Sequence, residues 1–157
     1  MVDIGPQVAR HLLRHWLLRF PHSVELWQDL AKIEMIAEHY SASRFAYTVA
    51  RDHTSKGEAR DFAELVLAKI CLLQGDPDAA VALLAPHGAR ATTWSRFRLA
   101  QALRDQGRFE EARAALERLG ADWQGRREYW WLSADVLQGL NDVDDAQKCW
   151  ARAGRIR

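Results

Sequence analysis

The chain has 157 residues and a formal net charge of +1, with 48% hydrophobic and 27% charged residues. This composition is typical of a folded domain or a short repeat array and argues against disorder. The near-neutral charge gives no electrostatic reason to expect a nucleic-acid partner. No apolar run approaches the roughly 20 residues of a membrane-spanning helix. The first residues mix arginine and histidine with apolar residues and do not resemble a secretory signal, so we expect a cytoplasmic protein.

The first predicted element is a single amphipathic helix over residues 6–21. Ala9, Leu13 and Trp16 follow helical spacing, and Pro21 closes the segment. This spacing is that of the second helix of a helical hairpin, so we interpret the segment as half of a repeat. Its apolar residues are more than one neighbouring helix can cover, so we expect an apolar patch here and a homodimer through an end helix.

Four helix–turn–helix repeats are predicted to follow, at residues 24–53, 58–87, 91–119 and 126–156. In each repeat a small residue on the first helix is followed twelve positions later by a small residue on the second. Successive pairs lie 37, 32 and 34 residues apart, a period typical of stacked helical repeats. The small residues allow the two helices of a repeat to cross closely. The pairs are Ala31 and Ser43, Ala68 and Ala80, Ala100 and Ala112, and Ala134 and Ala146.

The turns and helix starts carry signals of their own. Gly75 and Gly107 are predicted to end the first helices of the second and third repeats, because glycine readily adopts the left-handed conformation. Asp76 and Asp142 are expected to cap the second helices that follow them. Ser41 and the segment 55–58 are expected to cap two further helices.

These residues resemble the tetratricopeptide repeat family. The best matches are Trp27-x-x-Leu30-Ala31 and the last repeat, with Trp130, Ala134, Leu137, Ala146, Trp150 and Ala153. The resemblance covers residues 6–156 and implies an all-α fold. This fold is a right-handed α–α superhelix of about four repeats plus one N-terminal helix, in a single domain over residues 1–157. Glu64 and Arg96 replace the opening aromatic residue, and Glu34 and His87 occupy usually apolar sites. Neighbouring helical-repeat families therefore remain alternatives for the outer repeats.

The resemblance also implies a peptide-binding groove on the concave side, lined by the first helix of each repeat. Its aromatic and cationic residues suit an extended or helical peptide that carries acidic and apolar residues. Packing between helices is the alternative for Leu65, Leu72 and Phe97, whereas Trp94 and Trp131 are expected to be partly exposed. The implied lining residues are Gln28, Lys32, Met35, Phe62, Leu65, Lys69, Leu72, Trp94, Phe97, Gln101, Arg104, Trp131 and Asp135.

No set of residues predicts catalysis, a cofactor or a metal site. His11 and His15 have metal-ligand spacing on one helix, but no acidic residue completes a site. Cys71 and Cys149 are predicted core residues. The family's carboxylate clamp is not expected, because its asparagines are absent. We therefore expect a non-enzymatic scaffold or adaptor of bacterial type that binds a protein or peptide segment. The alternatives are the repeat region of a larger enzyme or secretion-system protein, or a secretion-type chaperone.

Overall fold

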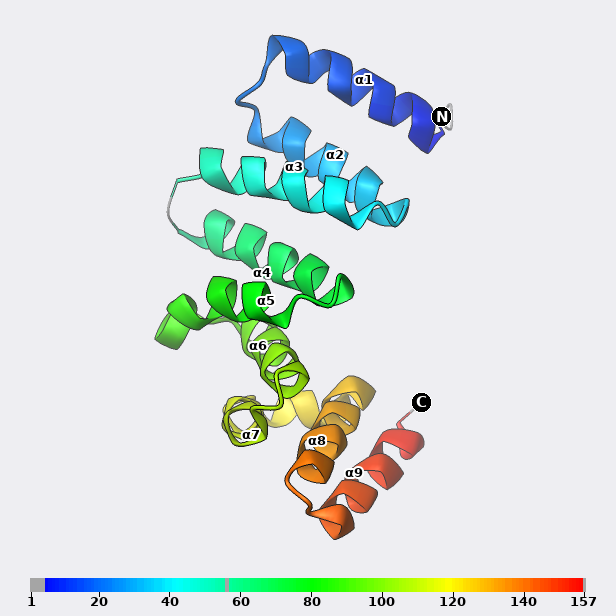
Figure 1. Cartoon of the computed structure of the whole chain (residues 1–157), viewed down its shortest axis with the longest axis vertical. Coiled ribbons are helices and arrows are strands. Elements are labelled where there is room, and N and C mark those ends of the chain that lie inside the picture. Colours follow the sequence, from blue (N-terminus) through cyan, green and yellow to red (C-terminus); the bar gives the residue numbers. More distant parts are fainter. Residues whose placement is uncertain (1–4, 56, 157) are drawn as a thin grey trace. The chain divides into compact units, whose positions relative to one another are not determined.

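The computed structural model describes residues 5–55 and 57–156, with the backbone alone at residues 89 and 90. These residues form nine α-helices, two short 3-10 helices and no strand, which confirms the all-α prediction (Figure 1). The helices are α1 (Pro6–Arg19), α2 (Val24–Ile36), α3 (Tyr40–His53), α4 (Glu58–Leu73), α5 (Pro77–Leu84), α6 (Thr93–Asp105), α7 (Phe109–Glu117), α8 (Arg127–Gly139) and α9 (Val143–Arg155). The 3-10 helices are η1 (Ala85–Arg90) and η2 (Ala121–Gly125).

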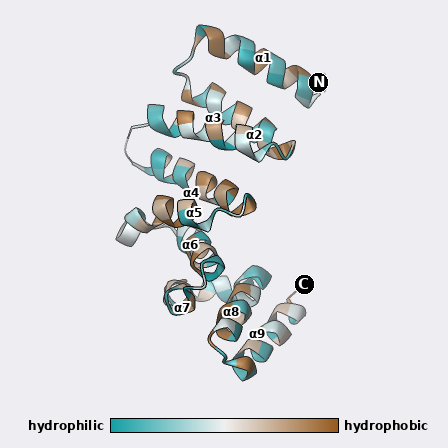
Figure 2. Cartoon of the chain, viewed as in Figure 1, coloured by the Kyte–Doolittle hydropathy of each residue, from teal (hydrophilic) through white to brown (hydrophobic). Residues whose placement is uncertain are grey.

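The chain divides into two compact units, Met1–Gly75 and Asp76–Arg157, here called the N-terminal and C-terminal units. In the N-terminal unit, α1 packs on α2, α2 on α3 and α3 on α4. In the C-terminal unit, α5 packs on α6, α6 on α7, α7 on α8 and α8 on α9. Each helix carries both hydrophobic and hydrophilic residues, as an amphipathic helix in a layered array requires (Figure 2).

The predicted small residues are all buried between the two helices of their repeat. All eight are fully buried, with 0% of their surface exposed. In the first repeat the Ser43 hydroxyl on α3 donates a hydrogen bond to the Ala31 carbonyl oxygen on α2, at 2.8 Å. This bond crosses directly between the two helices, so the backbones approach closely at this point.

A left-handed residue follows every first helix, seven positions after the small residue. Gly75 and Gly107 have φ of 71° and 74°, as predicted, and the corresponding residues Glu38 and Asn141 have φ of 59° and 63°. Residues with a Cβ atom rarely adopt this backbone conformation. The two non-glycine residues therefore show that the short turn between the helices demands a positive φ whatever the residue.

Two of the predicted caps are confirmed and two are wrong. The side chains of Asp76 and Asp142 accept hydrogen bonds from the backbone N–H groups of Ala79 and Asp145. Ser41 instead lies inside α3, where its hydroxyl accepts a hydrogen bond from Gln74. The predicted capping box at 55–58 includes residue 56, which lies outside the described residues; the cap of α4 is Gly57 and not Ser55.

In two repeats the aromatic residue that opens the first helix forms a hydrogen bond to the loop before that helix. In the first and last repeats the indole N–H groups of Trp27 and Trp130 donate to the carbonyl oxygens of Pro21 and Gln124, at 2.8 and 2.7 Å. In both cases the acceptor lies six residues earlier in the chain. The tryptophan at this repeat position therefore makes the same hydrogen bond in the first and the last repeat.

A bulky side chain at a small-residue position should destabilise the fold. Ala112→Trp places an indole where Ala112 is 0% exposed, and such overpacking costs about 1–3 kcal/mol or more. Ala114→Trp on the exposed side of the same helix is the matched control. Urea unfolding should show a large loss of stability for the first variant alone. Equal midpoints for the two variants would contradict the close crossing.

Replacing Glu38 by glycine should stabilise the protein. Relief of the left-handed strain gains up to about 1 kcal/mol after the flexibility of glycine in the unfolded chain is subtracted. Gln147→Gly, on an exposed position inside α9, is the control and should lower stability by roughly 0.5–1 kcal/mol. Thermal melts followed by circular dichroism distinguish the two. A lower melting temperature for Glu38→Gly would show that the turn does not need this conformation.

Candidate peptide-binding surface

The predicted groove residues occupy the same few positions on each first helix. Counted from the buried small residue, they lie at −6, −3, +1 and +4, which is one face of an α-helix. We call this the first-helix face. In the N-terminal unit it belongs to α2 and α4, and in the C-terminal unit to α6 and α8.

On α2 and α4 the first-helix face is mixed in polarity. Phe62 has 58% of its surface exposed. Lys32 pairs with Asp29 at 3.0 Å, and this hydrogen bond raises the pKa of the Lys32 ammonium. The other members of the predicted set on these helices are half-buried. They are Gln28, Met35, Leu65, Lys69 and Leu72.

At the start of α6 the indole of Trp94 is 43% exposed, which confirms the predicted exposure. One edge of its ring packs against Trp123 of η2, with ring centroids 4.8 Å apart. The Arg126 guanidinium lies 5.2 Å from the Trp94 ring centroid and 5.0 Å from that of Trp123. A cation and an aromatic surface are therefore presented together at this point.

The second predicted tryptophan, Trp131 on α8, is 51% exposed. Its ring lies beside the Arg127 guanidinium, 5.8 Å from the ring centroid. Arg127 also donates to the Ile156 carbonyl oxygen at 2.6 Å, which fixes the position of the cation. Arg126, Arg127, Glu128 and Trp131 line an open pocket of about 430 Å³ at the start of α8, together with Gly125 and Ile156.

The polar members of the face link α6 to α8. Arg104 on α6 forms an ion pair with Asp135 on α8 and a second one with Asp105, at 2.7 Å. Gln101 accepts a hydrogen bond from Arg98 at 2.7 Å. A ligand that binds Arg104 through a carboxylate would have to displace Asp135 from it.

Phe97 corrects the predicted lining. Its side chain is 2% exposed and belongs to the core of the C-terminal unit. The ring of Trp123 stacks on it, with centroids 4.8 Å apart and the planes inclined by 27°. The segment around Trp123 lies between two predicted repeats, so the repeat pattern does not predict this cover. A tryptophan between two glycines, Gly120 and Gly125, was the available signal.

The remaining candidate groups are dispersed. His11 and His15 are exposed on α1. Cys71 and Cys149 are buried, as predicted, and burial raises the pKa of the Cys149 thiol, which keeps it protonated and poorly reactive. Among the helices of the described residues, none combines the length and apolar character needed to cross a membrane.

Alanine substitutions should separate the core aromatic residue from the exposed one. Phe97→Ala removes a buried ring and should lower the free energy of unfolding by about 3–5 kcal/mol. Trp131→Ala on the exposed face should cost about 1 kcal/mol or less. Urea unfolding of both variants measures the difference. Similar losses in the two would contradict the division between core and face.

Comparison with known proteins supports the repeat assignment. The family model described as tetratricopeptide repeat matches residues 62–86 and 93–118. No curated protein matches the chain. Among solved structures, YrrB, described as a TPR protein with an unusual peptide-binding site, superposes with a TM-score of 0.80 at 13% identity over 97% of this chain and 78% of that one. A MamA protein gives a TM-score of 0.81 at 17% identity over 94% and 80% of the two chains.

A further similar structure is residues 41 to the end of MamA from Desulfovibrio magneticus RS-1. It gives a TM-score of 0.84 at 12% identity, over 98% of this chain and 86% of that one. At these identities the likeness concerns the fold alone. Residues 62–86 and 93–118 match the tetratricopeptide repeat, and the fold of the chain is that of solved tetratricopeptide repeat proteins.

Proposed function

We propose that the protein is a non-enzymatic scaffold or adaptor that binds a peptide or protein segment on its first-helix face. The observation that carries the proposal is the pair of exposed tryptophans, Trp94 and Trp131, each beside an arginine. Large aromatic residues with a neighbouring cation are typical anchors of protein interfaces. Burying exposed apolar side chains of this size against a ligand would be favourable, because it removes their apolar surface from water.

The chemistry of the face defines the ligand. Apolar side chains of a bound segment would pack on the two indoles, and acidic side chains would pair with Arg126 and Arg127. In the N-terminal unit, Phe62 and Lys69 offer the same combination of an aromatic surface and a cation. The proposed ligand is therefore an extended or helical segment with alternating acidic and apolar residues.

Further support comes from YrrB, which shares the fold and is described as having a peptide-binding site. We also propose that the protein acts in a bacterial cytoplasm. The second candidate function is the repeat region of a larger enzyme or secretion-system protein, or a secretion-type chaperone. The full reading frame that contains this sequence distinguishes these candidates.

Peptides selected on the wild-type protein by display of a random library provide the test. The double variant Trp94→Ala/Trp131→Ala should bind these peptides at least tenfold more weakly in fluorescence anisotropy. Trp150→Ala is the control, because it removes a tryptophan of 38% exposure from the second helix α9. Selected peptides should be enriched in acidic and apolar residues. Unchanged affinity in the double variant would overturn the proposed site.

A further inference from the structure

The N-terminal helix α1 exposes positions that are buried in α3. Aligned on the small residue, Ala9 corresponds to Ser43 of α3. In α3 the buried positions of this stripe are Ser43, Ala46, Tyr47 and Ala50, all at most 3% exposed. The corresponding residues of α1 are Ala9, Leu12, Leu13 and Trp16. Of these, Leu12 is 43% and Trp16 47% exposed.

These residues form one wall of a groove between α1 and α2, here called the α1–α2 groove. Its volume is about 470 Å³. In the C-terminal unit, α6 lies against both α7 and α8, which also contact each other. The helices α1 and α2 correspond to α7 and α8, so the α1–α2 groove occupies the place where α6 packs on those two helices. The lining residues are Ala9, Leu12, Leu13, Trp16, Asp29, Lys32 and Ile33.

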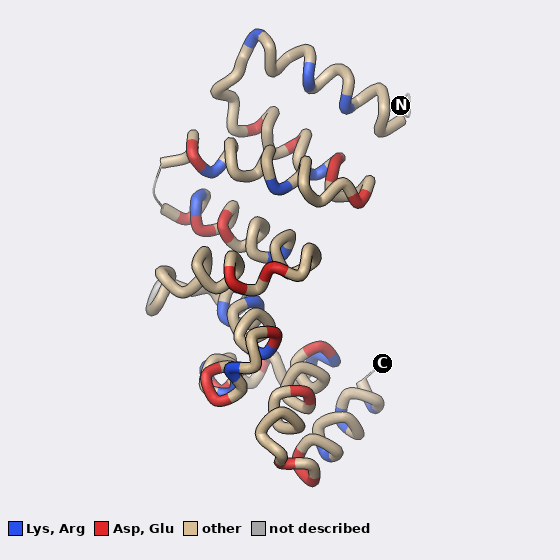
Figure 3. The backbone as a smooth tube through the Cα atoms, viewed as in Figure 1, with Lys and Arg blue, Asp and Glu red and all other residues tan. Residues whose placement is uncertain are grey.

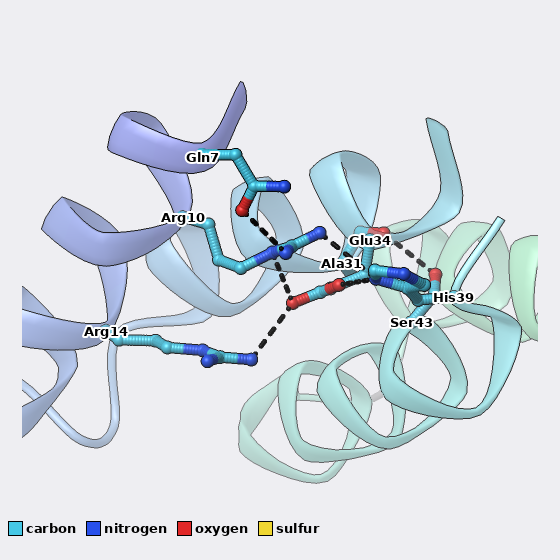
Figure 4. Close-up of polar contacts among 7 residues, drawn as sticks. All are labelled: Gln7, Arg10, Arg14, Ala31, Glu34, His39 and Ser43. Atoms are coloured by element: carbon cyan, nitrogen blue, oxygen red, sulfur yellow. Dashed lines mark hydrogen bonds and ion pairs between the residues drawn. The ribbon is translucent and has the colours of Figure 1, made fainter. Parts of the chain in front are cut away.

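The opposite flank of α1 is fixed by a buried carboxylate. Glu34 on α2 is 2% exposed and lies 3.0 Å from Arg10 Nε and 3.2 Å from Arg14 Nη2 (Figure 4). Its second oxygen lies 2.9 Å from His39 Nδ1. A buried charge is costly without its partners, so these contacts hold α1 in one orientation. The α1–α2 groove is therefore formed before any partner binds.

The charge of α1 indicates the occupant. The helix has basic residues and no acidic one, as Figure 3 shows. By helical spacing, His15 and Arg19 border the exposed stripe, and the structure shows no ion pair for either among the described residues. The Asp29–Lys32 pair on the α2 side is neutral as a whole. Two copies joined through this stripe would bring cationic helices together, which disfavours a symmetric dimer.

We propose that the α1–α2 groove binds an acidic amphipathic helix of a partner protein. The bound helix would run antiparallel to α1, as the first helix of a helical hairpin does. A small residue at its centre would lie over Ala9, and large apolar residues would pack on Leu12 and Trp16. Acidic residues in its first turns would meet Arg19, where they also suit the helix dipole. This site shares Lys32 with the first-helix face, but its apolar wall belongs to α1, and it does not include Trp94 or Trp131, which carry the proposed function.

Two fluorescein-labelled 18-residue peptides test the proposal by fluorescence anisotropy with the full chain. Both carry one apolar face with tryptophan and leucine around a central alanine, spaced as in α8. One has glutamate and the other lysine at the remaining positions. The glutamate peptide should bind at least tenfold more tightly than the lysine peptide. Equal binding of the two, or binding of neither, would overturn the proposal.

Two charge-matched variants locate the site. Leu12→Arg should lower the affinity for the glutamate peptide at least tenfold, although the added positive charge alone would raise that affinity. Leu18→Arg adds the same charge on the other side of α1, where Leu18 is 82% exposed, and should not weaken binding. Circular dichroism checks that both variants are folded. Equal effects of the two substitutions would overturn the assignment to the groove.

Light scattering of the wild-type protein tests the competing occupant. A mass near 18 kDa, that of one chain, is expected at micromolar concentration. A doubled mass that Leu12→Arg returns to a single chain would identify a second copy as the occupant and overturn the proposal of a separate partner.

Discussion

The close helix crossing at paired small residues is the constraint on which the other features depend. Every one of the eight residues is fully buried, and at Ser43 a hydroxyl bonds directly to the backbone of the facing helix. Because no larger side chain fits there, the crossing fixes the rotation of each helix about its axis. That rotation turns the first-helix face, with Trp94 and Trp131, toward solvent. The exposure of these two tryptophans is thus a consequence of how the same helices pack through their small residues.

Much of the fold could be predicted from the sequence, because the repeat signal is local. Small residues twelve apart, glycine turns and aspartate caps each act within one helical hairpin. The positive φ of Glu38 and Asn141 could not be predicted from residue type, since the geometry of the turn overrides the preference of the residue. For Phe97 the sequence leaves the groove and packing between helices open, because Trp123, which covers it, lies outside the repeat pattern. The exposed tryptophans followed from helical spacing alone.

Glu34 illustrates what a local pattern cannot show. In the sequence it departs from the apolar residue usual at this site of the repeat. In the structure it is buried and paired with Arg10 and Arg14, which lie 24 and 20 residues earlier on α1. At this position, ion pairs between the Glu34 carboxylate and α1 thus take the place of the apolar contacts that are usual in the repeat. This exchange leaves the other side of α1 free to form a second surface, chemically distinct from the first-helix face.

Nuclear Overhauser effects between alanine methyl groups test the crossing most directly. In protein labelled at alanine methyls, Ala100 should show a strong effect to Ala112, and Ala134 to Ala146. These residues are fully buried on paired helices that pack on each other, so we predict that their methyl groups are neighbours. Absence of both effects in the folded protein, with each methyl contacting larger side chains instead, would contradict the account.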